Sequence, residues 1–154
     1  MKLEDILEKS SVLADLCART KRDVLLELIR PLADQNLIPN RDEALRVILD
    51  RENLGSTGIG DGVAIPHGKL KTIDSILCVF GRSKAGIDFE SVDEKPVHIF
   101  FLLLAPEGSA SLHLKVLSRI SKILRDSSFR KKLLTLPDEY AIYETVIAED
   151  RKIL

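Results

Sequence analysis

The first third of the chain contains two stretches in which apolar residues recur at helical spacing. A helix is expected to start at Thr20–Asp23. Its apolar face comprises Val24, Leu25, Leu28, Ile29 and Leu32. After a break at Pro39, Asn40 followed three positions later by Glu43 is the pattern of a capping box. A second helix therefore begins there, with Ala44, Val47 and Ile48 on its apolar face, and it should end between Asn53 and Gly55.

The middle of the chain changes to short apolar runs typical of strands. Val63–Ile65 forms a short strand after a glycine-rich loop, and Ser75–Phe80 forms another, rich in β-branched and aromatic residues. Val97–Leu104 is almost unbroken in its apolar character, which predicts a central strand covered on both faces.

Helical spacing returns in the last third. After Pro106 and Gly108 we expect a long amphipathic helix. Its apolar stripe comprises Val116, Leu117, Ile120, Ile123 and Leu124. A shorter helix around Phe129–Leu134 follows, and Pro137-Asp138 opens a last helix that runs through Ile147. Helices and strands alternate without a repeat or a linker, so residues 1–154 are expected to form one α/β domain, a mixed β-sheet flanked by helices on both sides.

Bulk composition narrows the functional classes. The 23 basic and 24 acidic residues nearly cancel, which gives no whole-chain attraction to nucleic acid or to a membrane surface. No apolar run approaches the roughly 20 residues that cross a bilayer, so no membrane insertion is expected. The acidic start of the chain lacks the pattern of a signal peptide, and Cys17 and Cys78 lie too far apart for a Cys-x-x-Cys pair. A cytoplasmic location is expected.

The most informative segment is the one that ends in His67. Glycines at 58, 60 and 62 permit positive φ and close backbone approach, and they expose amides able to receive phosphate oxygens. The spacing fits neither a dinucleotide-binding fingerprint nor a Walker A loop. A short apolar run then leads to Pro66 and His67, which Gly68 follows. This arrangement suits a single imidazole in an exposed turn, within reach of another macromolecule.

The twenty residues from Arg51 to Leu70 closely resemble the active-site segment of the type-2 IIA proteins (fructose/mannitol type) of the bacterial phosphoenolpyruvate-dependent phosphotransferase system. Within that family the segment is most similar to the nitrogen-regulatory branch. The resemblance implies the fold of the type-2 IIA domain and makes His67 the phosphoryl acceptor. It also matches Arg51 to an arginine of the motif, and His113-Leu114 to a His-Leu segment whose histidine flanks the phosphorylated one.

The individual residues also have simpler interpretations. At the start of a helix, His113 faces the same side as Val116, so it either orients a phosphoryl group or is a partly buried structural histidine. Ser56 and Thr57 either donate to phosphoryl oxygens, with support from Gly58 and Gly60, or cap the turn. The remaining side chains are less specific. His98, inside a strand, is expected to be structural, and Lys69 either extends a basic surface or is an ordinary surface residue.

The resemblance implies protein-to-protein phosphoryl transfer through a phosphohistidine intermediate, with no cofactor and no metal. The donor would be a small histidine phosphocarrier protein of the HPr/NPr type, and the recipient a regulatory target protein or a permease IIB domain. Docking should use an apolar rim around His67, for which Ile59, Ile65 and Leu70 are the candidates.

Two alternatives remain open. The chain could be a sugar-specific IIA that serves a fructose- or mannitol-type permease; the absence of attached IIB or IIC sequence and the flanks of the His67 segment favour the regulatory branch. The more distant alternative is a metal-dependent hydrolase in which His67, His98 and His113 form a three-histidine site, although the sequence lacks the His-Glu spacing of metal enzymes.

Overall fold

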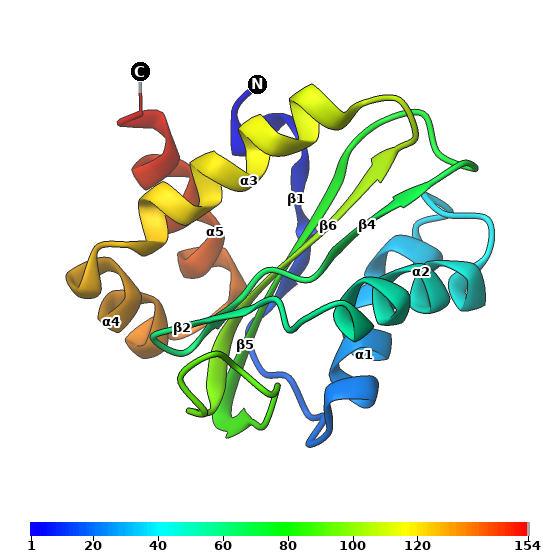
Figure 1. The fold of residues 1–154 in the computed structure, drawn as a ribbon. Helices are drawn as coiled ribbons and strands as arrows, with labels where there is room; N and C mark the ends of the chain where they lie inside the picture. Colours follow the sequence, from blue (N-terminus) through cyan, green and yellow to red (C-terminus); the bar gives the residue numbers. More distant parts are fainter. Residues whose placement is uncertain (154) are drawn as a thin grey trace.

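The computed structural model describes residues 1–153, which form one mixed β-sheet with helices on both faces (Figure 1). The strands are β1 (Leu7–Leu13), β2 (Gly58–Gly60), β3 (Val63–Ala64), β4 (His67–Leu70), β5 (Leu77–Ile87) and β6 (Val97–Pro106). The helices are the short 3-10 helix η1 (Leu3–Asp5), α1 (Lys21–Asp34), α2 (Arg41–Asn53), α3 (Ala110–Leu124), α4 (Ser127–Thr135) and α5 (Glu139–Arg151). The predicted fold class is confirmed.

Strand β6 is the centre of the sheet, whose order is β1-β5-β6-β3-β2, with β4 also paired to β6. Strand β5 runs antiparallel to β6 and parallel to β1. Strands β3 and β4 both run parallel to β6, one after the other along its length, and β2 folds back antiparallel on β3. Residues 97 and 99–105 are all buried, which confirms the prediction of a strand covered on both faces.

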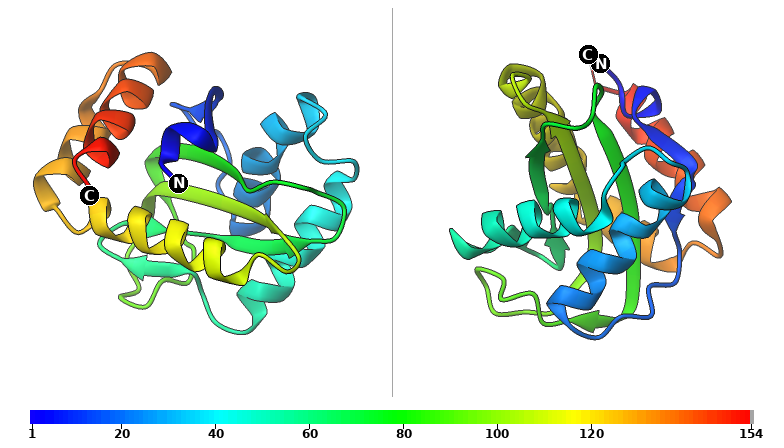
Figure 2. Two further views of the ribbon diagram at one scale, coloured as in Figure 1. Left: turned by 90° about the horizontal axis from the view of Figure 1, so that it is seen from above. Right: turned by 90° about the vertical axis from the view of Figure 1, so that its right-hand side faces the viewer.

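The helices divide between the two faces of the sheet (Figures 1 and 2). Helices α1 and α2 enclose one hydrophobic core with Val79, Phe100 and Leu102 of the sheet. Helices α3, α4 and α5 enclose the other core with Phe80, Phe101 and Leu103. Neighbouring residues of one strand therefore alternate between the two cores, as strand geometry requires. The site described below lies where α2 on one face and α3 on the other approach β4.

The predicted helix starts are confirmed by their caps. The side chain of Thr20 accepts a hydrogen bond from the amide of Asp23, and the side chain of Asn40 accepts one from the amide of Glu43. Asp138 caps α5 in the same way through the amide of Ala141. Helix α2 ends at Asn53, within the predicted interval.

Besides strand β4, which is described with the site below, three features of the sheet were not predicted. Strand β1 was missed because its buried residues do not alternate: residues 8–10 are exposed, and its register with β5 shifts between Leu7 and Val12. Strand β5 is Leu77–Ile87 rather than Ser75–Phe80, because pairing with β6 extends it through a stretch that includes a buried arginine, Arg82. The expected glycine loop is partly strand, since residues 58–60 form β2 and pair with β3.

Candidate functional site

His67 is the first residue of β4 and is partly buried, not part of an exposed turn as the sequence suggested. Pairing fixes its place: His67 lies opposite Leu103 of β6, and the amide of Leu103 donates to the carbonyl of Pro66 at 2.9 Å. Gly68 has a packing role that the sequence did not reveal. A Cβ atom there would lie 2.6 Å from Cγ1 of Val47, so glycine allows α2 to approach the strand.

The imidazole of His67 is held by its own backbone. Its Nδ1 atom lies 2.8 Å from the carbonyl oxygen of Ile65. A carbonyl only accepts, so Nδ1 carries the proton and the lone pair of the neutral ring is on Nε2. Burial lowers the pKa of His67, and the guanidinium of Arg51 lowers it further, whereas the Ile65 carbonyl and the Glu52 carboxylate oppose this. The ring is therefore neutral at pH 7, with a nucleophilic Nε2.

His113, in the first turns of α3, lies against His67. The ring centroids are 5.3 Å apart and the ring planes meet at 80°. The side chain is buried, and its Nε2 atom has no hydrogen-bond partner among residues 1–153. Burial, with smaller contributions from His67 and Lys69, lowers the pKa of His113 to about 4, so this ring is also neutral at pH 7. A buried nitrogen without a partner needs an explanation, and a ligand beside His67 would supply one.

Arg51 is in the last turn of α2, where its Nη1 donates to the carbonyl of Gly55 at 2.9 Å. It shares with His67 and His113 a groove of about 660 Å³ between α2, β4 and α3. The residues that line it are Val47, Asp50, Arg51, Leu54, His67, Gly68, Lys69, Ala110, His113, Leu114 and Leu117. The groove thus contains His67, His113 and Arg51, which the sequence assigned to one site, and also Lys69, for which the sequence left a basic-surface and an ordinary surface role open.

The apolar residues beside the groove differ from those expected. Ile65 and Leu70 are buried in the two cores and cannot form a docking rim, whereas Ile59 is exposed. Leu54 at the end of α2 and Leu114 on α3 are the exposed apolar side chains that line the groove, with 84% and 66% of their surface accessible. Ile65 and Leu70 are buried because the segment from Val63 to Leu70 pairs with the central strand β6, and helices cover both faces of the sheet there.

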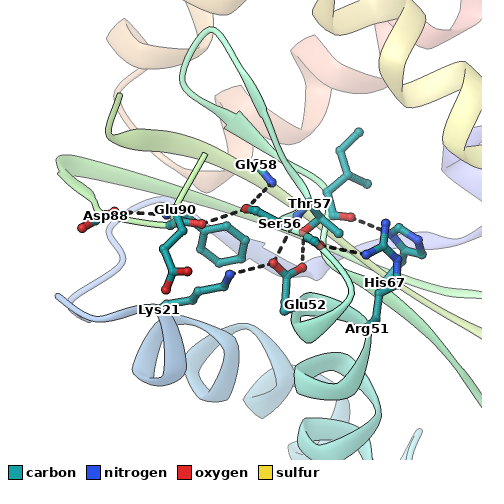
Figure 3. A network of polar contacts seen from close by, with 12 residues as sticks. Lys21, Arg51, Glu52, Ser56, Thr57, Gly58, His67, Asp88 and Glu90 are labelled. Carbon is teal, nitrogen blue, oxygen red and sulfur yellow. Dashed lines mark hydrogen bonds and ion pairs between the residues drawn. The ribbon is translucent and has the colours of Figure 1, made fainter. Parts of the chain in front are cut away.

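The residues expected to support phosphate tie the loop that joins α2 to β2 to neighbouring segments (Figure 3). The hydroxyl of Ser56 donates to the carbonyl of Phe89 and accepts from the amide of Gly58, at 2.8 and 3.0 Å. The hydroxyl of Thr57 donates to Glu52. Neither these residues nor Gly60, which pairs with Val63, line the groove. Their phosphate-binding role stays a prediction, and the bonds show that they shape the loop.

Glu52 is the residue of this region that sequence reasoning missed. Its side chain is buried, and its carboxylate accepts from the amide and the hydroxyl of Thr57 and pairs with Lys21 (Figure 3). Placed directly after Arg51, it looks like an ordinary charge at a helix end. Its spacing of four residues from Ile48 was the available signal, because that spacing puts it on the buried face of α2.

The third histidine does not join the other two. Nδ1 of His98 lies 2.8 Å from the carbonyl of Ser83, and its ring lies against Gly86, which agrees with the structural role expected of it. Residues 1–153 contain no group of three or more His, Cys, Asp or Glu side chains placed to hold a metal ion. The three-histidine metal site considered from the sequence is therefore not formed by these residues.

Comparison with known proteins defines the class to which this fold and site belong. Residues 5–149 match the family "Phosphoenolpyruvate-dependent sugar phosphotransferase system, EIIA 2". The chain belongs to this family of type-2 IIA proteins.

Particular relatives indicate the branch. A nitrogen regulatory protein of Bradyrhizobium diazoefficiens is 42% identical over 146 residues, 95% of each chain. The crystal structure of the nitrogen regulatory protein IIA-Ntr from Neisseria meningitidis superposes with a TM-score of 0.88 at 30% identity, over 94% of this chain and 98% of that one. The fructose-specific EIIABC component of Bacillus subtilis is 36% identical over 98% of this chain, which spans 24% of that protein. Among the described residues, no helix combines the length and apolar character needed to cross a membrane.

Proposed function

We propose that this chain is a phosphoryl carrier of the phosphotransferase system that accepts a phosphoryl group on Nε2 of His67. The observation that carries the proposal is the hydrogen bond from Nδ1 to the carbonyl of Ile65, since it directs the lone pair of the neutral ring to Nε2. The lowered pKa of His67 supports it, because only the neutral imidazole is a nucleophile.

The bonds that form and break in the transfer involve only two imidazoles and the phosphoryl group between them. Nε2 of His67 attacks phosphorus in line; as the new P–N bond forms, the bond to the donor's imidazole breaks and its electron pair returns to the donor nitrogen. The proton on Nδ1 of His67 stays there, where the Ile65 carbonyl stabilises the charge that develops on the ring. Both ends of the reaction are phosphohistidines, so transfer is reversible.

Two neighbouring side chains supply the charge balance. The guanidinium of Arg51 lines the same groove and offers planar donors to the phosphoryl oxygens. His113, neutral and with a buried Nε2 that lacks a partner, gains one when a phosphoryl oxygen lies between the two rings. Its role is to orient the group and to donate a hydrogen bond, not to accept the phosphoryl group.

The partners follow from the class of reaction. The donor is a small histidine phosphocarrier protein of the HPr/NPr type, which docks over the groove on the exposed side chains of Leu54 and Leu114. For the output we favour nitrogen-related regulation through a target protein that distinguishes the phosphorylated from the unphosphorylated form. The nitrogen regulatory relative that matches over 95% of both chains supports this choice, and the cytoplasmic location expected from the sequence suits it.

A sugar-specific role is the second candidate, supported by the match to the fructose-specific protein of Bacillus subtilis. The two roles differ in the recipient of the phosphoryl group. Purified chain, phosphorylated on His67, should keep its label when mixed with a fructose- or mannitol-type IIB domain if the output is regulatory. Rapid loss of the label to the IIB domain would support the sugar-specific role.

The acceptor itself is tested by labelling. Incubation with phosphoenolpyruvate, the first enzyme of the system and the histidine phosphocarrier should label the wild-type chain and leave His67→Ala unlabelled. His98→Ala is the matched control: it removes a histidine bonded to a carbonyl at the same 2.8 Å but outside the groove, and it should be labelled. A labelled His67→Ala variant would refute the assignment. Circular dichroism checks that the variants are folded. We expect that they are, because losing one hydrogen bond should lower the free energy of unfolding by only about 1 kcal/mol.

A further inference from the structure

The carboxylate of Glu52 is buried between α1, α2 and the loop before β2, beside the groove but not on its surface. Oε1 accepts from the backbone amide of Thr57 at 3.1 Å and lies 3.0 Å from Nζ of Lys21, and Oε2 accepts from the hydroxyl of Thr57. Nζ of Lys21 in turn lies 4.6 Å from the centroid of the Phe89 ring. One acidic side chain thus fixes a turn that two helices and a loop surround (Figure 3).

Hydrogen bonds connect this turn to His67. The carbonyl of Thr57 accepts from the amide of Ile65 at 3.0 Å. The carbonyl of Ile65, on the other side of the same residue, accepts from Nδ1 of His67 at 2.8 Å. Because Pro66 has no amide hydrogen and a restricted φ, the short path from Ile65 to His67 has little freedom. The orientation of the Ile65 carbonyl, and so the position of the imidazole, depends on where Thr57 is held.

The same turn also restrains Arg51. Its guanidinium donates to the carbonyl of Gly55 at 2.9 Å, and the amide of Gly55 donates to the backbone carbonyl of Glu52 at 3.0 Å. Loop residues between Glu52 and Thr57 therefore set the position of both groups that the proposed function places around the phosphoryl group. Displacement of this loop as a whole would therefore shift both the nucleophile and its cationic neighbour.

Stability alone is a poor reason for such an arrangement. A buried ion pair rarely stabilises a fold more than apolar residues of the same volume, because removing two charges from water is costly. Glu52 lies on the buried face of α2, one turn after Ile48, where packing alone does not call for a carboxylate. A carboxylate is required only if both of its oxygens must accept hydrogen bonds, here from the amide and the hydroxyl of Thr57.

We propose that Glu52 is a positioning residue for phosphoryl transfer, which acts through Thr57 and Ile65 to hold the imidazole of His67 in the Nδ1-protonated tautomer. The inference rests on the proposed function for its kinetic consequence, but its structural part concerns the tautomer alone and is measured without any phosphoryl donor.

The experiment compares Glu52→Gln and Glu52→Ala with a matched control, Asp150→Asn. Asp150 is the other buried carboxylate that accepts from a backbone amide, that of Leu3 at 2.8 Å, while pairing with a basic side chain, Arg119 at 2.8 Å. It lies in α5 and does not line the groove. Asp150→Asn therefore shows the effect of losing fold stability without changing the position of His67. If Glu52→Ala fails to fold, Glu52→Gln, which retains one acceptor oxygen, takes its place.

Two measurements are made on each variant. The ¹⁵N chemical shifts of the imidazole nitrogens at pH 8, assigned by comparison with His67→Ala, give the fraction of each tautomer of His67. The initial rate of labelling by the phosphorylated histidine phosphocarrier gives the transfer rate per folded molecule. We expect Nδ1–H in the wild type and in Asp150→Asn, a mixture in Glu52→Ala, and an intermediate fraction in Glu52→Gln. Transfer should slow roughly tenfold or more in Glu52→Ala, since misplacing a reacting group by about 1 Å can cost about 100-fold.

The outcomes separate the two proposals. If the Glu52 variants keep the wild-type tautomer and rate, or if Asp150→Asn changes both to the same extent, Glu52 has only a structural role and the inference is overturned. If the wild type itself takes no label, the proposed function fails, and the tautomer measurement still decides whether Glu52 positions His67.

Discussion

His113 presents its ring edge-on to that of His67, with the two ring centroids 5.3 Å apart. The two residues come from β4 and from the start of α3, 46 positions apart in sequence, and β6 brings them together because β4 pairs with it and α3 follows it. At this separation a proton on one ring disfavours a proton on the other, which is one reason that the pKa of His113 falls to about 4. The imidazoles of His67 and His113 are therefore both neutral when no anion is bound between them.

Replacing His113 should slow phosphoryl transfer without preventing it. His113→Ala removes the hydrogen-bond donor that we propose for the phosphoryl group but leaves Nε2 of His67 free, so we expect labelling that is roughly 10- to 100-fold slower and still reaches completion. Rapid-quench labelling with the phosphorylated carrier measures this rate. A His113→Ala rate equal to that of the wild type would make His113 a structural residue only, and the absence of any label in a folded variant would make it part of the acceptor itself.

Much of the candidate site could be predicted because the sequence resembles a known family. His67 and Arg51 lie within the twenty residues that carry the resemblance, and His113 is matched through the His-Leu pair at a helix start. Glu52 was not predictable in the same way. An acidic residue near a helix end usually faces water, and its partners, Lys21 and Thr57, come from another helix and from a loop that only the folded chain places beside it.

The two lowered histidine pKa values make the fold less stable in acid. The unfolded chain takes up protons on these residues near their usual pKa of about 6.5, whereas folded His113 does so only near pH 4. Between these values the unfolded state binds more protons, so the free energy of unfolding falls as the pH falls, by up to about 1.4 kcal/mol per pH unit for one histidine. Urea denaturation at pH 7.5, 6 and 5 should show a smaller loss in His113→Gln than in the wild type. Equal losses would contradict the buried, neutral state of His113.

The parts of the fold that sequence patterns missed have physical causes of their own. Strand β1 is an edge strand with a register shift, so its apolar residues do not alternate regularly. Its pairing with β5 defines it as a strand, and its sequence pattern does not. The second half of β5 contains Arg82, which reads as a solvent-facing charge. Its side chain is fully buried, and its guanidinium donates to the carbonyls of Ala14, Leu133 and Leu136.

Arg82→Met should therefore destabilise the fold strongly and leave transfer intact. The substitution keeps much of the apolar stem but leaves three carbonyls without their donor, so we expect a loss of about 3 kcal/mol or more in the free energy of unfolding. Arg46→Met is the control, since Arg46 is exposed on α2 and the same exchange there should change stability by less than about 0.5 kcal/mol. Chemical denaturation of both variants measures these changes. Similar midpoints for the two variants would show that the Arg82 hydrogen bonds contribute little to the stability of the fold.

Close packing at Gly68 offers a test of how α2 and β4 hold the site together. Gly68→Ala places a Cβ atom 2.6 Å from Cγ1 of Val47, so the Val47 side chain or the helix that carries it must shift. Such overpacking costs about 1–3 kcal/mol, and because His67 precedes Gly68 directly, transfer should also slow. The double variant Gly68→Ala/Val47→Ala lacks the clash. Its stability and its transfer rate should therefore be close to those of Val47→Ala alone. Denaturation and labelling rates of the three variants form a double-mutant cycle. Additive effects would show that the approach of Val47 to Gly68 does not position His67.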